Sequence, residues 1–220
     1  MIPVKICGIT TYEDAEIAVN YGASAIGMIF YKGSPRYIYP EKVEEWISAI
    51  PEKMKKVGVF VNEKRKNIKT IVEELDLDYI QLHGDEPPEY CNKMIKPVIK
   101  VFRVGTDFDP AVLNNFHVYA FLFDTYQRGR PGGTGKSFNW NLISDLKTDT
   151  PIILSGGLNS ENINKVLGTF QPSAIDVNSG VESKLGIKDK VKVKKLFNTI
   201  ENLNYVANNR SVFVGNFHEI

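Results

Sequence analysis

Two side chains that could exchange protons stand at the ends of apolar runs in this 220-residue chain. Cys7 closes the run VKIC (4–7), directly before Gly8, and Asp124 closes the run VYAFLFD (118–124). A thiolate can remove a proton, although a free thiol has a pKa of about 8.5 and needs positive charge nearby to ionise at neutral pH. A carboxyl group in apolar surroundings has a raised pKa, which suits a general acid. The two residues therefore indicate acid–base chemistry.

The role of Cys7 stays open on residue type alone, because a lone cysteine can fill a core, form half of a disulfide, bind a metal or react as a thiol. Cys7 and Cys91 are the only cysteines, and with three histidines they form neither a zinc-finger spacing nor a disulfide scaffold. Cys91 lies in a helix pattern and is expected in the core. His117 and His218 are expected to be structural. A reducing cytoplasm is the expected compartment.

Lys5 stands two residues before Cys7, so both side chains should point to the same face of a strand. We expect Lys5 either to bias Cys7 toward thiolate or to pair with Asp176 on a neighbouring strand. In a protein that binds a phosphosugar, Lys5 could also form a Schiff base with a carbonyl substrate, which leaves aldolase chemistry as an alternative.

The overall charge and hydropathy exclude several classes of partner. The net charge is +1, with no basic footprint for nucleic acid and no polybasic patch for a membrane surface. No run approaches the 18 or so apolar residues of a membrane span, and the N-terminal MIPVKICGIT has no export pattern. We expect a cytoplasmic protein that binds a small molecule, as a monomer or a homodimer.

Short apolar runs alternate with helix patterns along most of the chain. The runs are VKIC (4–7), AIGMIF (25–30), VGVFV (57–61), YIQL (79–82), VIKVFRV (98–104), VYAFLFD (118–124), PIILS (151–155) and AIDV (174–177). Their length and composition are typical of parallel strands that are buried on both faces. Eight strands with about eight helices predict a single (β/α)8 TIM barrel over residues 1–205, with a doubly wound open sheet as the alternative. Residues 206–220 form an extension of unknown role.

Polar and glycine residues follow most of these runs, at the end of a barrel where active sites lie. LSGGLNSENI (154–163) leads into a helix pattern that begins near Asn159 or Ser160, and VNSGVES (177–183) holds another glycine. Glycines and helix N-termini bind anions, and the loops after strands 7 and 8 are the usual phosphate site of this fold. The alternative is that these glycines only make tight turns. The site residues expected here are His83, Gly156, Gly157, Asn178, Ser179 and Gly180.

The segment DTYQRGRPGGTGKSFNW (124–140) is rich in glycine and basic residues. Its length and composition indicate a mobile loop over a site, or else a tolerated surface insertion.

Several motifs in one order resemble the phosphoribosylanthranilate isomerase family of tryptophan biosynthesis. They are KICGIT (5–10), SPRYI (34–38), VGVFVN (57–62), QLHGDE (81–86), FDT (123–125), GGTGKSFNW (132–140), LSGGLNSENI (154–163), DVNSGVES (176–183) and GIKD (186–189). The resemblance implies a (β/α)8 barrel that isomerises N-(5-phosphoribosyl)anthranilate and needs no metal or cofactor. A non-catalytic barrel that binds a phosphosugar is a further alternative.

The resemblance also implies roles for residues. Cys7 matches the family's general base and Asp124 its general acid. Arg36 in SPRYI matches the arginine that meets the anthranilate carboxylate, and the SGG and NSG turns match the phosphate loops. His83 and Asp176 are given supporting roles. Asn178 departs from the family, which commonly has serine there.

Overall fold

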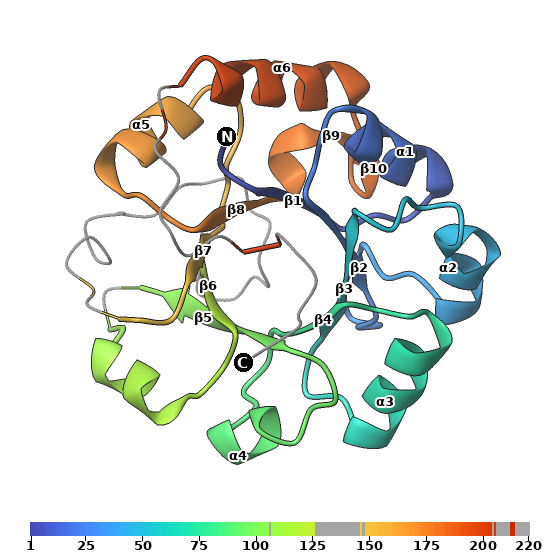
Figure 1. Cartoon of the computed structure of the whole chain (residues 1–220), viewed down its shortest axis with the longest axis vertical. Coiled ribbons are helices and arrows are strands. Elements are labelled where there is room, and N and C mark those ends of the chain that lie inside the picture. Colours follow the sequence, from blue (N-terminus) through green and yellow to red (C-terminus); the bar gives the residue numbers. More distant parts are fainter. Residues whose placement is uncertain (106, 126–145, 147, 204, 206–211, 214–220) are drawn as a thin grey trace.

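Eight parallel strands close into one barrel, in the order β1 to β8, with helices around it (Figure 1). The computed structural model describes residues 1–105, 107–125, 146, 148–203, 205 and 212–213. The predicted TIM barrel is confirmed, and the open-sheet alternative is wrong because β1 pairs with β8. No helix in these described residues is long and apolar enough to cross a membrane.

The strands follow the predicted runs closely. They are β1 (Val4–Cys7), β2 (Ala25–Ile29), β3 (Lys55–Phe60), β4 (Tyr79–Leu82), β5 (Val98–Val104), β6 (Ala120–Thr125), β7 (Ile152–Leu154) and β8 (Ala174–Val177). A short antiparallel hairpin that the sequence did not predict follows β8, and it consists of β9 (Glu182–Lys184) and β10 (Ile187–Lys188).

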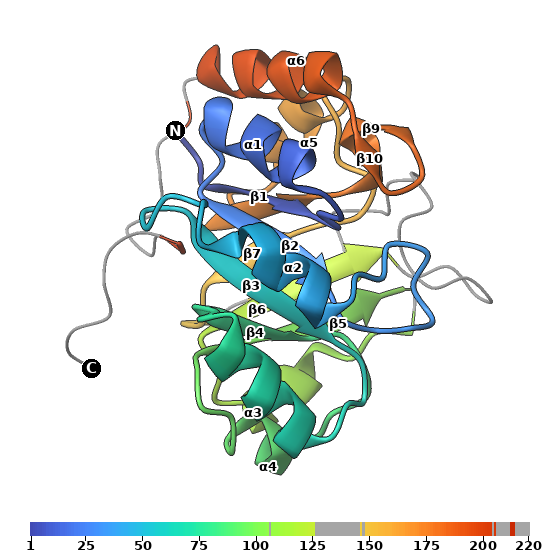
Figure 2. The ribbon, with the colours of Figure 1, turned by 90° about the vertical axis from the view of Figure 1, so that its right-hand side faces the viewer.

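Helices lie between most of the strands in the part of the chain that is described. They are α1 (Tyr12–Asn20), α2 (Pro40–Ile47), α3 (Arg65–Glu74), α4 (Pro88–Cys91), α5 (Ile163–Thr169) and α6 (Lys190–Glu201), with 3-10 turns η1 (Pro110–Asn115) and η3 (Ser179–Val181). Between β5 and β6 the connection is therefore a 3-10 helix, not an α-helix. Figure 2 shows α1, α2, α3 and α6 stacked along the outside of the barrel.

The first helix is capped at both ends. Thr11 accepts a hydrogen bond from the backbone N–H of Asp14, at 3.2 Å, and so caps one of the free donors at the helix start. Gly22 follows the last turn with φ +85°, a left-handed conformation that favours glycine. These two caps fix the length of the connection from β1 to β2.

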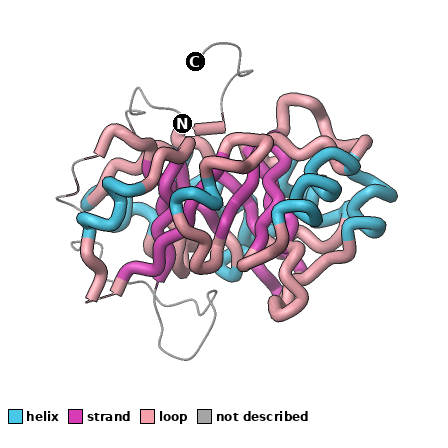
Figure 3. The backbone as a smooth tube through the Cα atoms, turned by 90° about the horizontal axis from the view of Figure 1, so that it is seen from below, coloured by secondary structure: helices cyan, strands magenta, loops and turns pink. Residues whose placement is uncertain are grey.

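Alternation along each strand divides the core into two layers. Ile6 and Ile175 pack outward against the helices. Ala25, Ile99 and Leu122 point into the barrel. The same alternation turns the polar residue at the carboxyl end of several strands inward, above this apolar interior. Figure 3 shows the tilted strands at the centre with the helices outside them.

Two residues of the expected C-terminal extension close the other end of the barrel. Val212 and Phe213 are buried in the inner apolar cluster, which holds the residues at the amino ends of the strands. The Phe213 ring meets the Tyr79 ring edge-on, with 5.5 Å between centroids. Figure 1 places this short segment over the middle of the ring of strands. His218 and the segment 126–140 lie outside the described residues, so the expectations for them are untested.

Candidate active site

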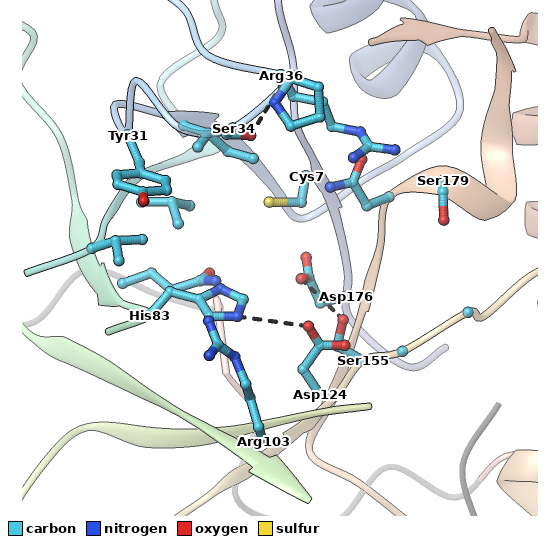
Figure 4. A pocket seen from close by; sticks show the side chains of 18 of the residues that line it. Cys7, Tyr31, Ser34, Arg36, His83, Arg103, Asp124, Ser155, Asp176 and Ser179 are labelled. Carbon is cyan, nitrogen blue, oxygen red and sulfur yellow. Dashed lines mark hydrogen bonds and ion pairs between the residues drawn. The ribbon is translucent and has the colours of Figure 1, made fainter. Parts of the chain in front are cut away.

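One cavity of about 270 Å³ opens at the carboxyl ends of the strands (Figure 4). The structure brings every predicted site residue to its wall, namely Cys7, Arg36, His83, Asp124, Gly156, Gly157, Asp176, Asn178, Ser179 and Gly180. Strand and loop residues far apart in the sequence therefore share one concave site. Their roles in a reaction are a separate question from their position.

Cys7 lies at the end of β1, beside a buried ion pair. Lys5 donates to Asp176 across the β1–β8 ladder, with 2.8 Å between Nζ and Oδ1. A Cβ atom built on Gly27 of β2 would lie 2.9 Å from Lys5 Nζ and 3.0 Å from Cys7 Sγ. Glycine at position 27 therefore makes room for both side chains, since real Cβ contacts are longer than this.

Burial and the neighbouring ammonium group act in opposite directions on the Cys7 thiol. Burial raises the pKa of Cys7, and the positive charge of Lys5 lowers it by less, so that the pKa stays above its ordinary value. Burial alone would lower the pKa of Lys5, but the charges of Asp176 and Cys7 and the hydrogen bonds to them together outweigh burial and raise that pKa. Lys5 therefore favours the thiolate form of Cys7, as expected, although burial has the larger effect and the pKa of the thiol stays raised. The expected Lys5–Asp176 pair is confirmed.

Asp124 is buried at the end of β6 and faces His83, which follows β4. His83 Nε2 lies 3.6 Å from Asp124 Oδ2, too far for a hydrogen bond. Burial, with the positive charges of Arg103 and Lys5, lowers the pKa of His83 to about 3. His83 is therefore neutral near pH 7, and its contact with Asp124 is not an ion pair there.

The loop that carries His83 is fixed from both sides by a buried carboxylate. Glu86 accepts the backbone N–H groups of Asn62, at 2.8 Å, and of Gly84, at 3.0 Å. Lys100 of β5 donates to Glu86 at 2.7 Å and to the Gly84 carbonyl at 2.8 Å. These bonds join the ends of β3, β4 and β5, so the backbone next to His83 has little freedom.

The two glycine turns lie against each other. Gly156 and Gly157 have φ of +95° and +67°, and a Cβ on Gly180 would lie 1.9 Å from the Leu158 carbonyl oxygen. Only glycine allows this approach of the two loops. Their backbone groups line one end of the cavity.

The helix after β7 begins later than predicted. The sequence places its start near Asn159 or Ser160, whereas α5 begins at Ile163. Asn159 accepts the backbone N–H groups of Glu161 and Asn162, and so forms a polar turn in place of the first helical turn. Asparagine side chains compete with the backbone in this way, which explains the shift.

Arg36 is buried in the loop between β2 and α2, and Glu182 fixes its orientation. The guanidinium donates from Nε and from Nη2 to the two oxygens of Glu182, both at 2.7 Å. Lys188 donates to the same carboxylate at 3.0 Å and to the side-chain oxygen of Asn178 at 3.0 Å. Asn178 is therefore held by a buried lysine.

Sequence reasoning missed several residues at or behind the cavity wall. Those on the wall include Tyr31, Gln81 and Arg103, and those behind it are Glu182 and Lys188. Arg103 follows Ile99 and Val101 at the same parity along β5, so alternation alone could have predicted its inward position. Gln81 interrupts a buried apolar strand, and its Oε1 is buried with no hydrogen-bond partner among the described residues.

The cavity combines one thiol, buried carboxyl groups, a neutral imidazole, an oriented guanidinium and two backbone turns. That set can bind an anion at each end and exchange protons between them. Among the described residues, no three His, Cys, Asp or Glu side chains gather in a way that could hold a metal ion. Both cysteines are free thiols, and Cys91 is buried in the outer core as expected.

Comparison with known proteins gives one consistent result. The chain matches the family model described as "N-(5'phosphoribosyl)anthranilate (PRA) isomerase" over residues 4–199. The N-(5'-phosphoribosyl)anthranilate isomerase of Geobacter sulfurreducens is 42% identical over 197 residues, which cover 89% of this chain and 96% of that protein.

Solved structures agree. Monomers generated from the dimeric phosphoribosylanthranilate isomerase of Thermotoga maritima superpose with a TM-score of 0.81 at 37% identity, covering 92% of this chain and 100% of that one. A phosphoribosylanthranilate isomerase in complex with reduced 1-(o-carboxyphenylamino)-1-deoxyribulose 5-phosphate has a TM-score of 0.80 at 38% identity, with the same coverage.

Proposed function

Because this chain belongs to the N-(5'-phosphoribosyl)anthranilate isomerase family, we propose that Cys7 and Asp124 are the base and the acid of its reaction. The enzyme catalyses an aldose–ketose isomerisation in tryptophan biosynthesis. It converts N-(5'-phosphoribosyl)anthranilate to 1-(o-carboxyphenylamino)-1-deoxyribulose 5-phosphate. The observation that supports the residue assignment is that both side chains line the same cavity, on β1 and β6.

The first step needs an acid at the ring oxygen of the ribose. Asp124, in its protonated form, delivers a proton to that oxygen, so that the C1–O bond breaks and an iminium forms between C1 and the anthranilate nitrogen. The buried position of Asp124 keeps water away from the group that donates. His83, which is neutral, contacts the carboxyl group and supports its position.

The second step needs a base at C2. Cys7, as thiolate, removes the C2 proton, and the electron pair of that C–H bond moves to neutralise the iminium and gives an enolamine. The enolamine then takes a proton at C1 while its C2 hydroxyl loses one, so that C2 becomes a carbonyl and the aminoketone forms. The sugar is oxidised at C2 and reduced at C1, so no external oxidant or reductant takes part. Lys5 stabilises the thiolate, and Asp176 holds Lys5 in place.

The two ends of the substrate are anions, and the cavity has a site for each. Backbone groups of Gly156, Gly157 and Gly180, with Ser179, are placed to bind the phosphate. Arg36 binds the anthranilate carboxylate through the N–H groups that Glu182 leaves free. Recognition at both ends then holds C1 and C2 between Cys7 and Asp124.

The structure disfavours the Schiff-base alternative. An amine attacks a carbonyl only when it is unprotonated. Lys5 is fully buried and ion-paired, and its pKa is raised. Borohydride in the presence of substrate should therefore leave the mass of the protein unchanged.

We further propose a cytoplasmic enzyme whose barrel spans residues 1–205, with the remainder as an extension. Two free thiols suit a reducing compartment. A homodimer or a monomer is expected, and the Thermotoga maritima relative is described as dimeric. Light scattering of the full chain distinguishes the two.

The direct test of the reaction uses wild-type protein and substrate generated in situ from anthranilate and phosphoribosyl pyrophosphate. Loss of the substrate's fluorescence on adding the protein is the expected result. Folded protein that leaves the fluorescence unchanged would overturn the activity. Inorganic phosphate should compete with the substrate, since the glycine turns bind its phosphate.

A further inference from the structure

Glu182 and Lys188 lie behind the cavity and have no part in the proton transfers described above. They are opposite each other in the β9–β10 hairpin, where the register pairs Lys188 with Glu182. Both side chains are buried. A buried ion pair that serves stability alone is often no better than an apolar pair of the same size, so its presence here calls for another explanation.

Glu182 controls which edge of Arg36 faces the cavity. An arginine has five N–H donors in one plane. Glu182 accepts from Nε and from one hydrogen of Nη2, at 2.7 Å each, and a bidentate pair of this kind fixes the plane of the guanidinium. The edge formed by Nη1 and the second hydrogen of Nη2 is left for a ligand. That edge can bind a second carboxylate with two parallel hydrogen bonds.

Lys188 keeps the charge at this point positive and connects it to the phosphate end. One carboxylate faces two cations, Arg36 at 2.7 Å and Lys188 at 3.0 Å, so the cluster carries a net charge of +1 toward an anion. Lys188 also donates to the side chain of Asn178, in the turn after β8. The carboxylate-binding and phosphate-binding ends of the cavity thus share one buried network.

The β9–β10 hairpin is anchored to the segment that follows Cys7, which consists of the loop after β1 and the first turn of α1. Asp14 accepts the backbone N–H of Lys188 at 3.0 Å, and Thr10 donates to the Gly186 carbonyl at 2.7 Å. On the other side of the network, a Cβ on Gly8 would lie 2.8 Å from both Arg36 Cδ and Asn178 Oδ1. Packing therefore leaves Arg36 little room to turn away from Glu182.

We propose that Glu182 is a specificity-determining positioning residue, which orients Arg36 so that the site selects a substrate with an aromatic carboxylate. Lys188 holds Glu182 in turn and carries the positive charge that Glu182 would otherwise cancel. This inference rests on the proposed role of Arg36 in the isomerase. It assigns to the hairpin after β8 a function in substrate selection.

The test compares two inhibitors that differ only in the carboxylate. One is reduced 1-(o-carboxyphenylamino)-1-deoxyribulose 5-phosphate, and the other is the same compound with a phenyl ring that lacks the carboxylate. The ratio of their inhibition constants measures recognition of the carboxylate alone. We expect a preference of at least about tenfold in the wild type, which corresponds to about 1.4 kcal/mol. Arg36→Met should bring the ratio near one.

Glu182→Gln should reduce the preference at least about fivefold, while affinity for the inhibitor without the carboxylate changes less than about threefold. A purely structural role of Glu182 would weaken both inhibitors together. In the double variant with Arg36→Met, Glu182→Gln should cause no further loss of the preference for the carboxylate, because Glu182 acts through Arg36. Glu201→Gln on the exposed end of α6 is the matched control and should leave the ratio at its wild-type value.

A wild-type ratio in Glu182→Gln would overturn the inference. If that variant does not fold, Glu182→Asp decides, because the shorter side chain keeps the charge but cannot maintain both 2.7 Å bonds. It should lose part of the preference, and an unchanged ratio would again contradict the role. Wild-type protein that turns over substrate but shows no preference would remove Arg36 from carboxylate recognition. Wild-type protein with no turnover would instead overturn the proposed function.

Discussion

Lys5 and Asp176 are register partners on β1 and β8, and their side chains form a 2.8 Å ion pair inside the barrel, beside Cys7. Both side chains are buried, so water cannot take the place of either partner. The pair therefore has two effects, one on stability and one on the ionisation of the thiol.

Lys5→Met should show both effects. It leaves the Asp176 carboxylate buried without its partner, which costs about 3–5 kcal/mol of unfolding free energy. It also removes the charge that lowers the pKa of Cys7, so the alkaline rise in kcat/KM should move to higher pH. Urea unfolding and a pH–rate profile measure the two. The double variant with Asp176→Asn should recover part of the stability, and part of the pH shift as well, because the Asp176 charge raises the pKa of Cys7 by less than Lys5 lowers it. A pH profile of the double variant at or below the wild-type position would contradict this interpretation.

The wild-type pH profile follows from the buried thiol. Burial raises the pKa of Cys7, so only a small fraction is thiolate at neutral pH. We expect kcat/KM to rise with pH through the range of an ordinary thiol, about 8.5, and above it. His83, with a pKa of about 3, should give no inflection near pH 6.5. A profile that is flat from pH 6 to 9 would be incompatible with Cys7 as the base in the free enzyme.

Gly27→Ala should impair catalysis without a change in charge. The added methyl group would lie 2.9 Å from Lys5 Nζ and 3.0 Å from Cys7 Sγ, so one of these side chains must move. We expect a fall in kcat of at least about tenfold, since small displacements of catalytic groups are costly. Gly168→Ala in α5 is the control, because no atom lies within 4 Å of its added methyl group. Equal kcat values for the two variants would contradict the claim that a methyl group at position 27 displaces Lys5 or Cys7.

Phe213→Ala should lower stability and leave the chemistry unchanged. Phe213 is 3% exposed and packs edge-on against Tyr79 inside the barrel. Removing the ring should cost about 3 kcal/mol and lower Tm. Val191→Ala, at a side chain that is 75% exposed, provides the comparison and should leave Tm nearly unchanged. A wild-type Tm for Phe213→Ala would show that the C-terminal segment does not contribute to the core.

The barrel was predictable because its signal is local. Runs such as Tyr79–Leu82 and Ala174–Val177 are mostly apolar and are buried on both faces, and each helix pattern between such runs returns the chain to the same end. Strand-end residues such as Cys7 and Asp124 could then be placed in one site by topology alone. Arg103 and Gln81 follow from the same alternation and could have been added.

Other features depend on contacts between distant segments or on competing effects. Arg36 and Glu182 are 146 residues apart, and neither residue type nor spacing indicates that they meet. The late start of α5 comes from two asparagine side chains that bind the backbone locally. The pKa of Cys7 is a balance between burial and the charges of Lys5, Asp176 and Lys188, and the direction of the net shift follows only from the packed structure.

The most direct test of the acid–base pair is kcat for Cys7→Ser and Asp124→Asn, measured beside affinity for the reduced product analogue. Each variant should lose at least about a hundredfold in kcat, the usual size of a general acid or base contribution, and bind the analogue within about threefold of wild type. Cys91→Ser, the same change at the other buried cysteine, should keep its kcat. A folded Cys7→Ser or Asp124→Asn enzyme with more than about a tenth of wild-type kcat would contradict the assignment.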